Sequence, residues 1–151
     1  MNVRRAIPSE RSALEHLQRR ASLNNPGDRE ALLAHPDAIE VPAEQILAGE
    51  VLVAECDGVI AGFAAVKPRA DGDSELDALF VDPDLQRRGI GRQLIEHCAE
   101  VARTRGSSAL YVVGNPHAED FYTVCGFKTL GTTETRFGPA LLMCLRVSGP
   151  V

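Results

Sequence analysis

The sequence predicts a mixed α/β fold of the α+β class, in which helices flank one central, mostly antiparallel sheet. Before residue 50 apolar residues recur with helical spacing, whereas after residue 50 apolar and β-branched runs alternate with period two. One helical segment connects two of the later strands, which is the crossover that a parallel pair requires. We therefore expect the order strand, helices, three strands, helix, strand, helix and two strands.

Length and composition indicate one globular domain over residues 1–151. The chain is 44% hydrophobic and 25% charged, which is enough to bury a single core. Acidic residues outnumber basic ones 21 to 16, whereas a domain that wraps nucleic acid is usually basic. The longest apolar run, GVIAGFAAV, is far shorter than the roughly 20 residues that span a bilayer. We expect a soluble, cytoplasmic protein without a nucleic-acid or membrane partner.

The first half of the chain predicts a short strand and three helices. Residues 2–6 suit the strand, and Ser9 is the expected N-cap of the first helix, because its hydroxyl can accept a free backbone N–H. The stretch NNPGD interrupts that helix. DREALLAH, which ends at Pro36, and residues 42–47 predict two further short helices.

The second half predicts the sheet. EVLVAEC and VIAGFAAV are joined by Asp57 and Gly58, a strong hairpin signal because both residues tolerate positive φ. A polar turn leads to a third strand, ELDALFV. A helix from about residue 90 to Gly106 follows, with Ile90, Leu94 and Cys98 on one face. SALYVV, the short helix NPHAEDFYTVC and two final strands ending in ALLMCLRV complete the order.

The stretch QRRGIGRQL joins the third of these strands to the long helix and is the first candidate binding site. A glycine-bearing loop that enters a helix directs several backbone N–H groups and the positive end of the helix dipole at one point. Gly89 and Gly91 let a ligand approach the backbone, and the flanking arginines add donors. The spacing matches neither a Walker loop nor a dinucleotide fingerprint, so by itself it fits an anion site and a plain helix start equally.

Two motifs together resemble the GNAT N-acetyltransferase superfamily. QRRGIG is similar to its Q/R-x-x-G-x-G/A signature, and NPHAEDFYTVCGF is similar to its N-x-x-A-x-x-Φ-Y-x-x-x-G-F pattern, one helix and one strand later. The resemblance implies an acetyl-CoA-binding core over residues 50–147, with residues 1–49 forming helices on the acceptor side. It also implies that the parallel strands, ELDALFV and SALYVV, splay apart at the cofactor.

The resemblance further implies which residues bind acetyl-CoA. The amides of the glycine loop would hold its pyrophosphate, the Leu79 N–H would polarise the thioester carbonyl, and the Val81 backbone would pair with pantetheine. Tyr122 would be the general acid that protonates the leaving thiolate. The full set of expected cofactor contacts is Leu79, Phe80, Val81, Gln86, Arg87, Arg88, Gly89, Ile90, Gly91, Arg92, Asn115, Ala118, Phe121 and Tyr122.

Glu75 and Asp77 are the candidates for the general base that deprotonates the amine. Strand side chains alternate, so we expect both carboxylates on one side of the third strand together with Leu79 and Val81, about 6.6 Å apart. The resemblance ranks Glu75 first, because the histone-modifying branch of the superfamily carries its base at that place. Asp77 or an ordered water remains the alternative.

The expected function is direct transfer of an acetyl group from acetyl-CoA to a primary amine of a small molecule or peptide. A non-catalytic acyl-CoA-binding module and a small nucleic-acid-binding domain are the alternatives. His117 is expected near the cofactor groove, and Arg136 and Phe137 at the edge of the acceptor pocket. Four singly spaced cysteines predict no metal site. Homodimers are common in the family, and no sequence feature decides the oligomeric state.

Overall fold

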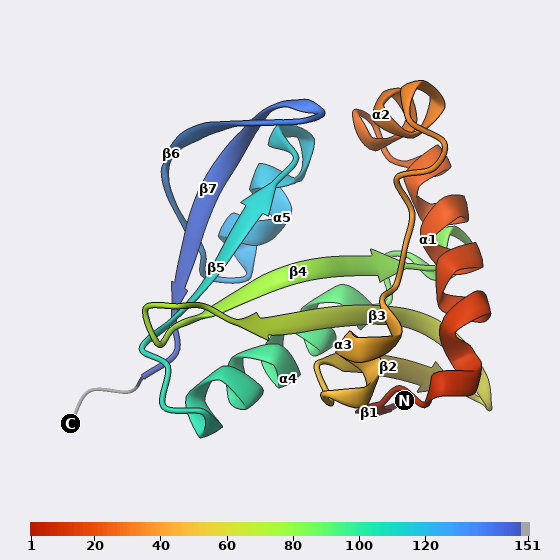
Figure 1. Cartoon of the computed structure of the whole chain (residues 1–151), viewed down its shortest axis with the longest axis horizontal. Helices are drawn as coiled ribbons and strands as arrows, with labels where there is room; N and C mark the ends of the chain where they lie inside the picture. The colour runs from red at the N-terminus through yellow and green to blue at the C-terminus, as the bar shows by residue number, and fades with distance from the viewer. Residues whose placement is uncertain (149–151) are drawn as a thin grey trace.

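A computed structural model describes residues 1–148 and builds them around one seven-stranded sheet of order β1-β2-β3-β4-β5-β7-β6 (Figure 1). Neighbouring strands are antiparallel except β4 and β5, which are parallel. The predicted fold class and the predicted order of helices and strands along the chain are therefore confirmed. Residues 149–151, which the single-domain expectation includes, lie outside the described residues. The strands are β1 (Asn2–Arg5), β2 (Val51–Cys56), β3 (Val59–Pro68), β4 (Ser74–Val81), β5 (Ala109–Gly114), β6 (Lys128–Thr135) and β7 (Gly138–Arg146).

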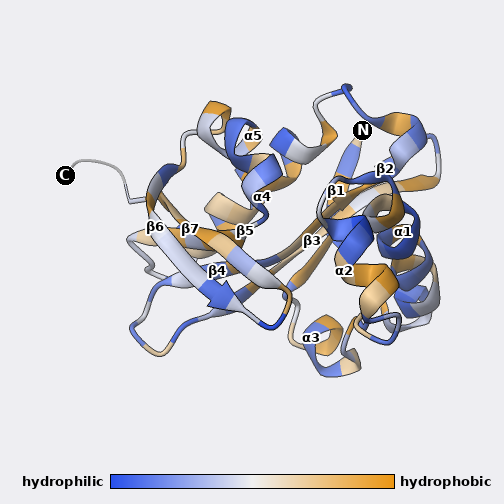
Figure 2. Ribbon diagram, turned by 90° about the horizontal axis from the view of Figure 1, so that it is seen from above, coloured by the Kyte–Doolittle hydropathy of each residue, from blue (hydrophilic) through white to orange (hydrophobic). Residues whose placement is uncertain are grey.

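Helices cover both faces of the sheet. Figure 2 shows α4 and α5 on one face and α1 and α3 on the other, with the apolar strands β2 and β3 between them. Within residues 1–148 no helix is both long and apolar enough to cross a bilayer. The helices are α1 (Arg11–Asn24), α2 (Asp28–Ala34), α3 (Ala43–Leu47), α4 (Ile90–Thr104) and α5 (Glu119–Val124), with short 3-10 turns at Pro8–Glu10, Pro83–Leu85 and Pro116–Ala118.

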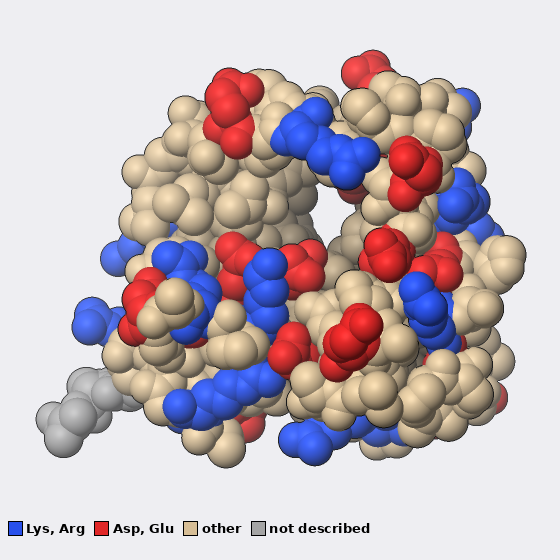
Figure 3. Space-filling view, in the orientation of Figure 1, with Lys and Arg blue, Asp and Glu red and all other residues tan. Residues whose placement is uncertain are grey.

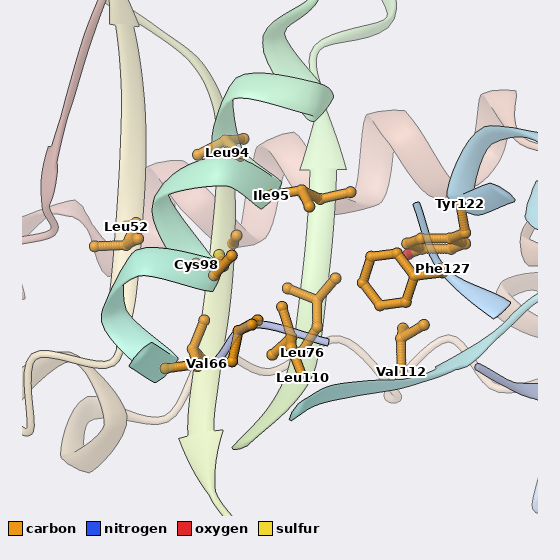
Figure 4. Packing of buried hydrophobic residues seen from close by; sticks show 14 of the residues in the cluster. Leu52, Val66, Leu76, Leu94, Ile95, Cys98, Leu110, Val112, Tyr122 and Phe127 are labelled. Atoms are coloured by element: carbon orange, nitrogen blue, oxygen red, sulfur yellow. The ribbon is translucent and has the colours of Figure 1, made fainter. Parts of the chain in front are cut away.

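Each face of the sheet has its own apolar cluster. In the cluster under α4, Leu94 and Cys98 are fully buried, as the helical spacing in the sequence predicts. Figure 4 shows these side chains above the strands, with Tyr122 and Phe127 of the α5 region continuing the same layer. In the cluster on the opposite face, Leu14 of α1 and Phe63 of β3 are central. Helices from both halves of the chain thus pack against the same central sheet.

The predicted hairpin between β2 and β3 is confirmed. Asp57 and Gly58 have φ of 51° and 78°, so both adopt the left-handed conformation that a two-residue hairpin turn needs. A second local prediction is also confirmed at the end of α4, where Gly106 has φ of 87° and follows the last helical turn.

The predicted N-cap at Ser9 is wrong. Ser9 lies inside the 3-10 turn Pro8–Glu10 that precedes α1, and its side chain forms no cap. Instead the Glu10 carboxylate accepts the Ile7 N–H at 2.9 Å and pairs with Arg4 at 2.6 Å. The charged acceptor of Glu10 therefore anchors this helix entry.

The expectation that Glu75, Asp77, Leu79 and Val81 share one side of β4 is also wrong. Opposite β3, the register shifts so that Ala65 pairs with Ala78 and Val66 with Leu76, which leaves Asp77 as an extra residue in a β-bulge. Leu79 and Val81 consequently pack with the α4 cluster, whereas Glu75 and Asp77 pair with Lys67 on the opposite face. A bulge of one residue reverses the alternation for everything beyond it.

The parallel pair β4 and β5 stays together only at one end. Pairing covers Ser74–Leu76 of β4 and Leu110–Val112 of β5, and past these residues the two strands diverge. The expected splay is therefore present, and it leaves the β5-facing edge of residues 77–81 without a strand partner among the described residues.

Candidate active site

A cleft of about 450 Å³ opens where β4 and β5 diverge. In Figure 3 the molecule is hollowed between the β5–β7–β6 side and the α1–α2 side, above β4. The cleft walls combine residues 76–81 of β4, the start of α4, residues 112–122 and the α1–α2 connection. The splay of the sheet thus creates a site that both halves of the chain complete.

Most of the residues expected to bind cofactor line this cleft, and some do not. Arg87, Arg88 and Arg92 are exposed beside it, Gly89 caps α4 in the same loop, and Ile90 is only 3% exposed within the α4 core. Of the two candidate bases, Asp77 lines the cleft and Glu75 does not. The expected residues that line it are Asp77, Leu79, Phe80, Val81, Gln86, Gly91, Asn115, Ala118, Phe121 and Tyr122.

The glycine loop has the conformation of an anion cradle. Gly89 has φ of 77° and Arg87 has φ of 64°, so the backbone turns sharply before entering the 15-residue helix α4. A Cβ built at Gly89 meets nothing within 4 Å, which means that the backbone faces open space there. Free amides at a helix N-terminus beside exposed arginines fit the phosphates of a nucleotide cofactor.

Asp82 fixes the start of this loop. Its carboxylate accepts the Asp84 N–H at 2.9 Å and pairs with Arg20 of α1. Partial burial alone would raise the pKa of Asp82, but the hydrogen bond from Asp84 and the pair with Arg20 outweigh it and lower the pKa. The N-terminal half therefore helps to hold the candidate phosphate site in place.

Two glycines make room for aromatic rings at the cleft. A Cβ at Gly91 would lie 3.1 Å from Cζ of Phe121, and one at Gly114 would lie 3.2 Å from the ring of Tyr122. Both distances are tighter than ordinary van der Waals contact. A side chain at either position would require the neighbouring ring to shift, so glycine suits the close approach of the first turn of α4 and of the end of β5 to α5.

Tyr122 is enclosed but keeps an accessible hydroxyl. The residue is 8% exposed, and its ring lies edge-on to Phe121 and Phe127, each with centroids 5.3 Å away. Its hydroxyl makes no hydrogen bond to residues 1–148 and is not fully enclosed, so it faces the cleft. Burial, and then the charge of Asp28, raise the pKa of Tyr122 well above its ordinary value. The phenol stays protonated at neutral pH and can act as a proton donor.

Asn115 connects the two walls of the cleft. It caps the following turn, because its Oδ1 accepts the His117 N–H at 2.9 Å. Its Nδ2 donates to the Pro26 carbonyl at 2.9 Å and to Asp28 Oδ1 at 3.0 Å. A Cβ at Gly27 would lie 2.4 Å from that nitrogen, so the bridge also requires glycine at position 27. Both amide hydrogens of Asn115 are thus used within the protein.

The two acidic residues of β4 share a lysine. Lys67 Nζ lies 3.2 Å from a carboxylate oxygen of Glu75 and 3.2 Å from one of Asp77, and Gln45 donates to Asp77 at 3.1 Å. Partial burial of Lys67 would lower its pKa, but the two carboxylates outweigh this effect and raise it. Of this group, Asp77 is the member that meets the cleft.

The α1–α2 connection is a part of the site that the sequence did not indicate. Asn25, Pro26 and Asp28 line the cleft, although NNPGD reads only as a helix breaker. Nothing local could have indicated this role, because the contact between Asp28 and Asn115 joins residues 87 positions apart. A proline and a glycine beside two hydrogen-bonding side chains were the only available sign of a shaped loop.

The weaker candidates divide into one that lines the cleft and two that lie beside it. His117 is part of the lining. Phe137, at the tip of the β6–β7 hairpin, stacks edge-on against His35 with centroids 5.2 Å apart, and Arg136 lies 4.9 Å above the Phe137 ring. The hairpin tip therefore meets the segment after α2. In the described part of the chain, no cluster of three or more His, Cys, Asp or Glu residues could hold a metal ion.

Comparison with protein families gives one match over most of the chain. The model of the Acetyltransferase (GNAT) family matches residues 13–127, a range that includes both the glycine loop and the Asn115–Phe127 motif.

Two curated relatives are similar in sequence. Peptidyl-lysine N-acetyltransferase YjaB of Salmonella typhimurium is 41% identical over 59 residues, which is 39% of this chain and 39% of that protein. The ribosomal protein bS18 alanine N-acetyltransferase of the same organism is 33% identical over 102 residues, which is 61% of this chain and 68% of that protein. The match to YjaB thus spans well under half the length of that relative.

Solved structures share the whole fold. A GCN5-related N-acetyltransferase from Rhodopseudomonas palustris superposes with a TM-score of 0.78 at 23% identity, covering 96% of this chain and 94% of that one. A ribosomal-protein-alanine N-acetyltransferase from Brucella melitensis has a TM-score of 0.73 at 27% identity, with 97% and 99% covered. A putative acetyltransferase from Salmonella typhimurium, solved with its cofactor acetyl-CoA, has a TM-score of 0.73 at 21% identity, with 100% and 96% covered.

Proposed function

This chain belongs to the Acetyltransferase (GNAT) family, and we propose that it transfers the acetyl group of acetyl-CoA directly to a primary amine of a small molecule or peptide. The observation that carries this proposal is one cleft shared by the unpaired edge of β4, the entry of α4 and the Tyr122 hydroxyl. In the described part of the chain no serine or cysteine lines that cleft. Direct transfer with both substrates bound therefore suits it better than an acyl-enzyme.

The glycine loop is the proposed site of the acetyl-CoA pyrophosphate. Its support is the left-handed backbone at Gly89, the open space beside it and the start of a long helix. From there the pantetheine arm would follow residues 79–81, whose edge has no strand partner and can pair with an extended ligand. The thioester would then lie deeper in the cleft, near Tyr122.

The proposed chemistry transfers one proton before the attack and two after it. The acceptor arrives as an ammonium, and Asp77, directly or through a water, takes its first proton; we place Asp77 above Glu75 because only Asp77 meets the cleft. The nitrogen attacks the thioester carbon, the C–N bond forms and the C–S bond breaks. The leaving thiolate takes the Tyr122 proton, and the second proton of the nitrogen restores the phenol.

The relatives support an amine on a protein or peptide as acceptor. One is named for peptidyl lysine and others for the alanine of a ribosomal protein, and in both cases the acetylated group is a primary amine. The cleft is consistent with this class, since it opens to the surface in Figure 3 between the two halves of the molecule.

A melting experiment followed by a CoA-release assay tests the proposed function. Acetyl-CoA is expected to raise the melting temperature, and free CoA is expected to accumulate with at least one acceptor among amines, polyamines, lysine peptides and peptides with a free N-terminal alanine. Stabilisation without CoA release against the whole panel would indicate a non-catalytic acyl-CoA-binding module instead. No shift with acetyl-CoA would refute the proposed function at its first step.

A further inference from the structure

Asp28 places a carboxylate in the cleft on the side formed by the N-terminal half of the chain. It is the first residue of α2, it is half-buried, and it lines the same cleft as Tyr122 and Asp77. Neither motif of the family resemblance includes it. The segment around it reaches the cleft because Asn115 ties Pro26 and Asp28 to the end of β5.

Within residues 1–148 the charge of Asp28 has no basic partner. The cleft lining contains two carboxylates, Asp28 and Asp77, and no lysine or arginine. Asp77 is balanced by Lys67 at 3.2 Å, whereas no Lys, Arg or His among residues 1–148 forms an ion pair with Asp28. A half-buried carboxylate without a counter-charge is stabilised by any cation that binds beside it.

Neutral amides hold the Asp28 carboxylate in position without cancelling its charge. Asn115 Nδ2 donates to Oδ1 at 3.0 Å, and Asn25 Nδ2 lies 3.5 Å from Oδ2. An ionised carboxylate accepts about four hydrogen bonds. Each oxygen therefore keeps room for a further donor, such as an N–H of an ammonium group.

Tyr122 is a second polar group in this cleft that has room for a ligand partner. It is more than nine-tenths buried, its hydroxyl lacks a partner within residues 1–148, and it faces the same cleft. The charge of Asp28 acts on it strongly enough to raise its pKa, although burial is the larger cause. A polar ligand between the carboxylate and the phenol would supply a cation to one and a hydrogen-bond partner to the other.

We propose that Asp28 binds the ammonium group of the acceptor and makes the enzyme select cationic amines. This assignment rests on the proposed function and names the acceptor class for the same site: an aliphatic primary amine that is protonated at neutral pH. The bound ammonium would lie near the hydroxyl of Tyr122. Acetylation converts this nitrogen into a neutral amide, so the attraction to Asp28 ends when the product forms.

The test compares Asp28→Asn with Glu30→Gln. Asparagine keeps an oxygen that can accept from Asn115 but removes the charge. Glu30 is an exposed acid of the same short helix and does not line the cleft, so Glu30→Gln removes the same charge outside the site. Asp28→Glu restores the charge. Melting temperatures of all variants check that each one is folded.

Binding of 1,4-diaminobutane and of a lysine-containing tripeptide to the CoA-saturated protein is measured by calorimetry at pH 7. Asp28→Asn is expected to weaken amine binding at least tenfold and to leave the acetyl-CoA Kd within twofold. Glu30→Gln should match the wild type, and Asp28→Glu should recover part of the affinity. Equal amine affinity in Asp28→Asn and wild type, or no amine binding to the wild type, would overturn the proposal. Amine binding that depends on Asp28 without any CoA release would keep this proposal and refute the proposed function alone.

Discussion

Asn115 Nδ2 donates a hydrogen bond to Asp28 Oδ1 over 3.0 Å and thereby joins the end of β5 to the start of α2. The bridge crosses the cleft between the two halves of the chain. It explains how a short, loop-rich N-terminal segment keeps a defined position beside the sheet.

Breaking this bridge should reduce stability and acceptor binding together. Asn115→Asp keeps an oxygen to cap the His117 N–H but removes both donors and places a second carboxylate against Asp28. We expect a fall of about 1–2 kcal/mol in the free energy of unfolding, measured by urea denaturation, and a rise in acceptor KM that exceeds any change in the acetyl-CoA Kd. An Asn115→Asp protein with wild-type stability and KM would show that the bridge does not position the segment.

The glycine loop can be tested with a pair of matched substitutions. Gly89 and Gly106 flank α4, have φ of 77° and 87°, and each has open space where a Cβ would stand. Alanine at either position should cost about 1–2 kcal/mol of stability, since both residues are left-handed. Only Gly89→Ala is expected to weaken acetyl-CoA binding, by about tenfold or more, in a calorimetric titration. Equal acetyl-CoA affinity in the two variants would remove the loop from the phosphate site.

Removing the Tyr122 hydroxyl should affect chemistry and leave folding unchanged. The hydroxyl makes no hydrogen bond to residues 1–148, so Tyr122→Phe is expected to keep the wild-type melting temperature and acetyl-CoA Kd. Turnover should fall about 10²-fold to 10⁴-fold, the usual contribution of a general acid. Tyr111→Phe is the control, because Tyr111 lies under Arg69 and outside the cleft lining. Similar turnover in both variants would exclude Tyr122 as the acid.

Matched substitutions can also show which of the two carboxylates of β4 is the general base. Asp77→Asn and Glu75→Gln each remove one of the two carboxylates that pair with Lys67 at 3.2 Å, so their structural effects are comparable. We expect kcat to fall about 10²-fold or more in Asp77→Asn and only a few-fold in Glu75→Gln. The reverse order would restore Glu75 as the base, and two unaffected variants would leave the proton to a water.

Stability should fall in alkaline solution because of buried acids that resist ionisation. Burial raises the pKa of Cys98 from 9.0 to about 12 and also raises that of Tyr122. A group whose pKa is higher in the folded than in the unfolded protein stabilises the fold fully at a pH below its unfolded-state pKa. This stabilisation is lost as the pH rises towards its folded-state pKa. For Cys98 the loss therefore runs from about pH 9 to pH 12, at up to about 1.4 kcal/mol per pH unit.

Urea denaturation between pH 8 and pH 11 measures this slope. Cys98→Ala should flatten it, while Cys56→Ala, at a partly exposed position, should keep the wild-type slope. Identical slopes in wild type and Cys98→Ala would contradict the assignment to this thiol.

Local sequence patterns predicted correctly those structural features that neighbouring residues produce by themselves. The Asp57-Gly58 hairpin, the apolar face of α4 and the end of α4 at Gly106 all depend on residues that are neighbours in sequence. The predicted Ser9 cap is wrong because the chain enters α1 through the 3-10 turn that contains Ser9, and Glu10, paired with Arg4 of β1, accepts the N–H of Ile7 at the start of that turn.

The prediction that four side chains share one face of β4 is wrong for a different reason. Alternation predicts which side chains lie together only while the register holds, and the bulge at Asp77 depends on how β3 and β4 pair. This single unpaired residue places Leu79 and Val81 on the face opposite the two carboxylates.

The fold class, the order of strands along the chain and the glycine loop could be predicted from the sequence alone. Each depends on periodicity, turn residues or a motif within a short contiguous stretch of the chain. What completes the cleft depends on contacts between distant segments: the bulge at Asp77, beyond which Leu79 and Val81 face the α4 cluster, and the bridge from Asn115 to Asp28. The bridge joins residues 87 positions apart, and the bulge depends on how β3 and β4 pair. The partners that stabilise the bridge and the bulge lie far away in the sequence, so no local pattern predicts them.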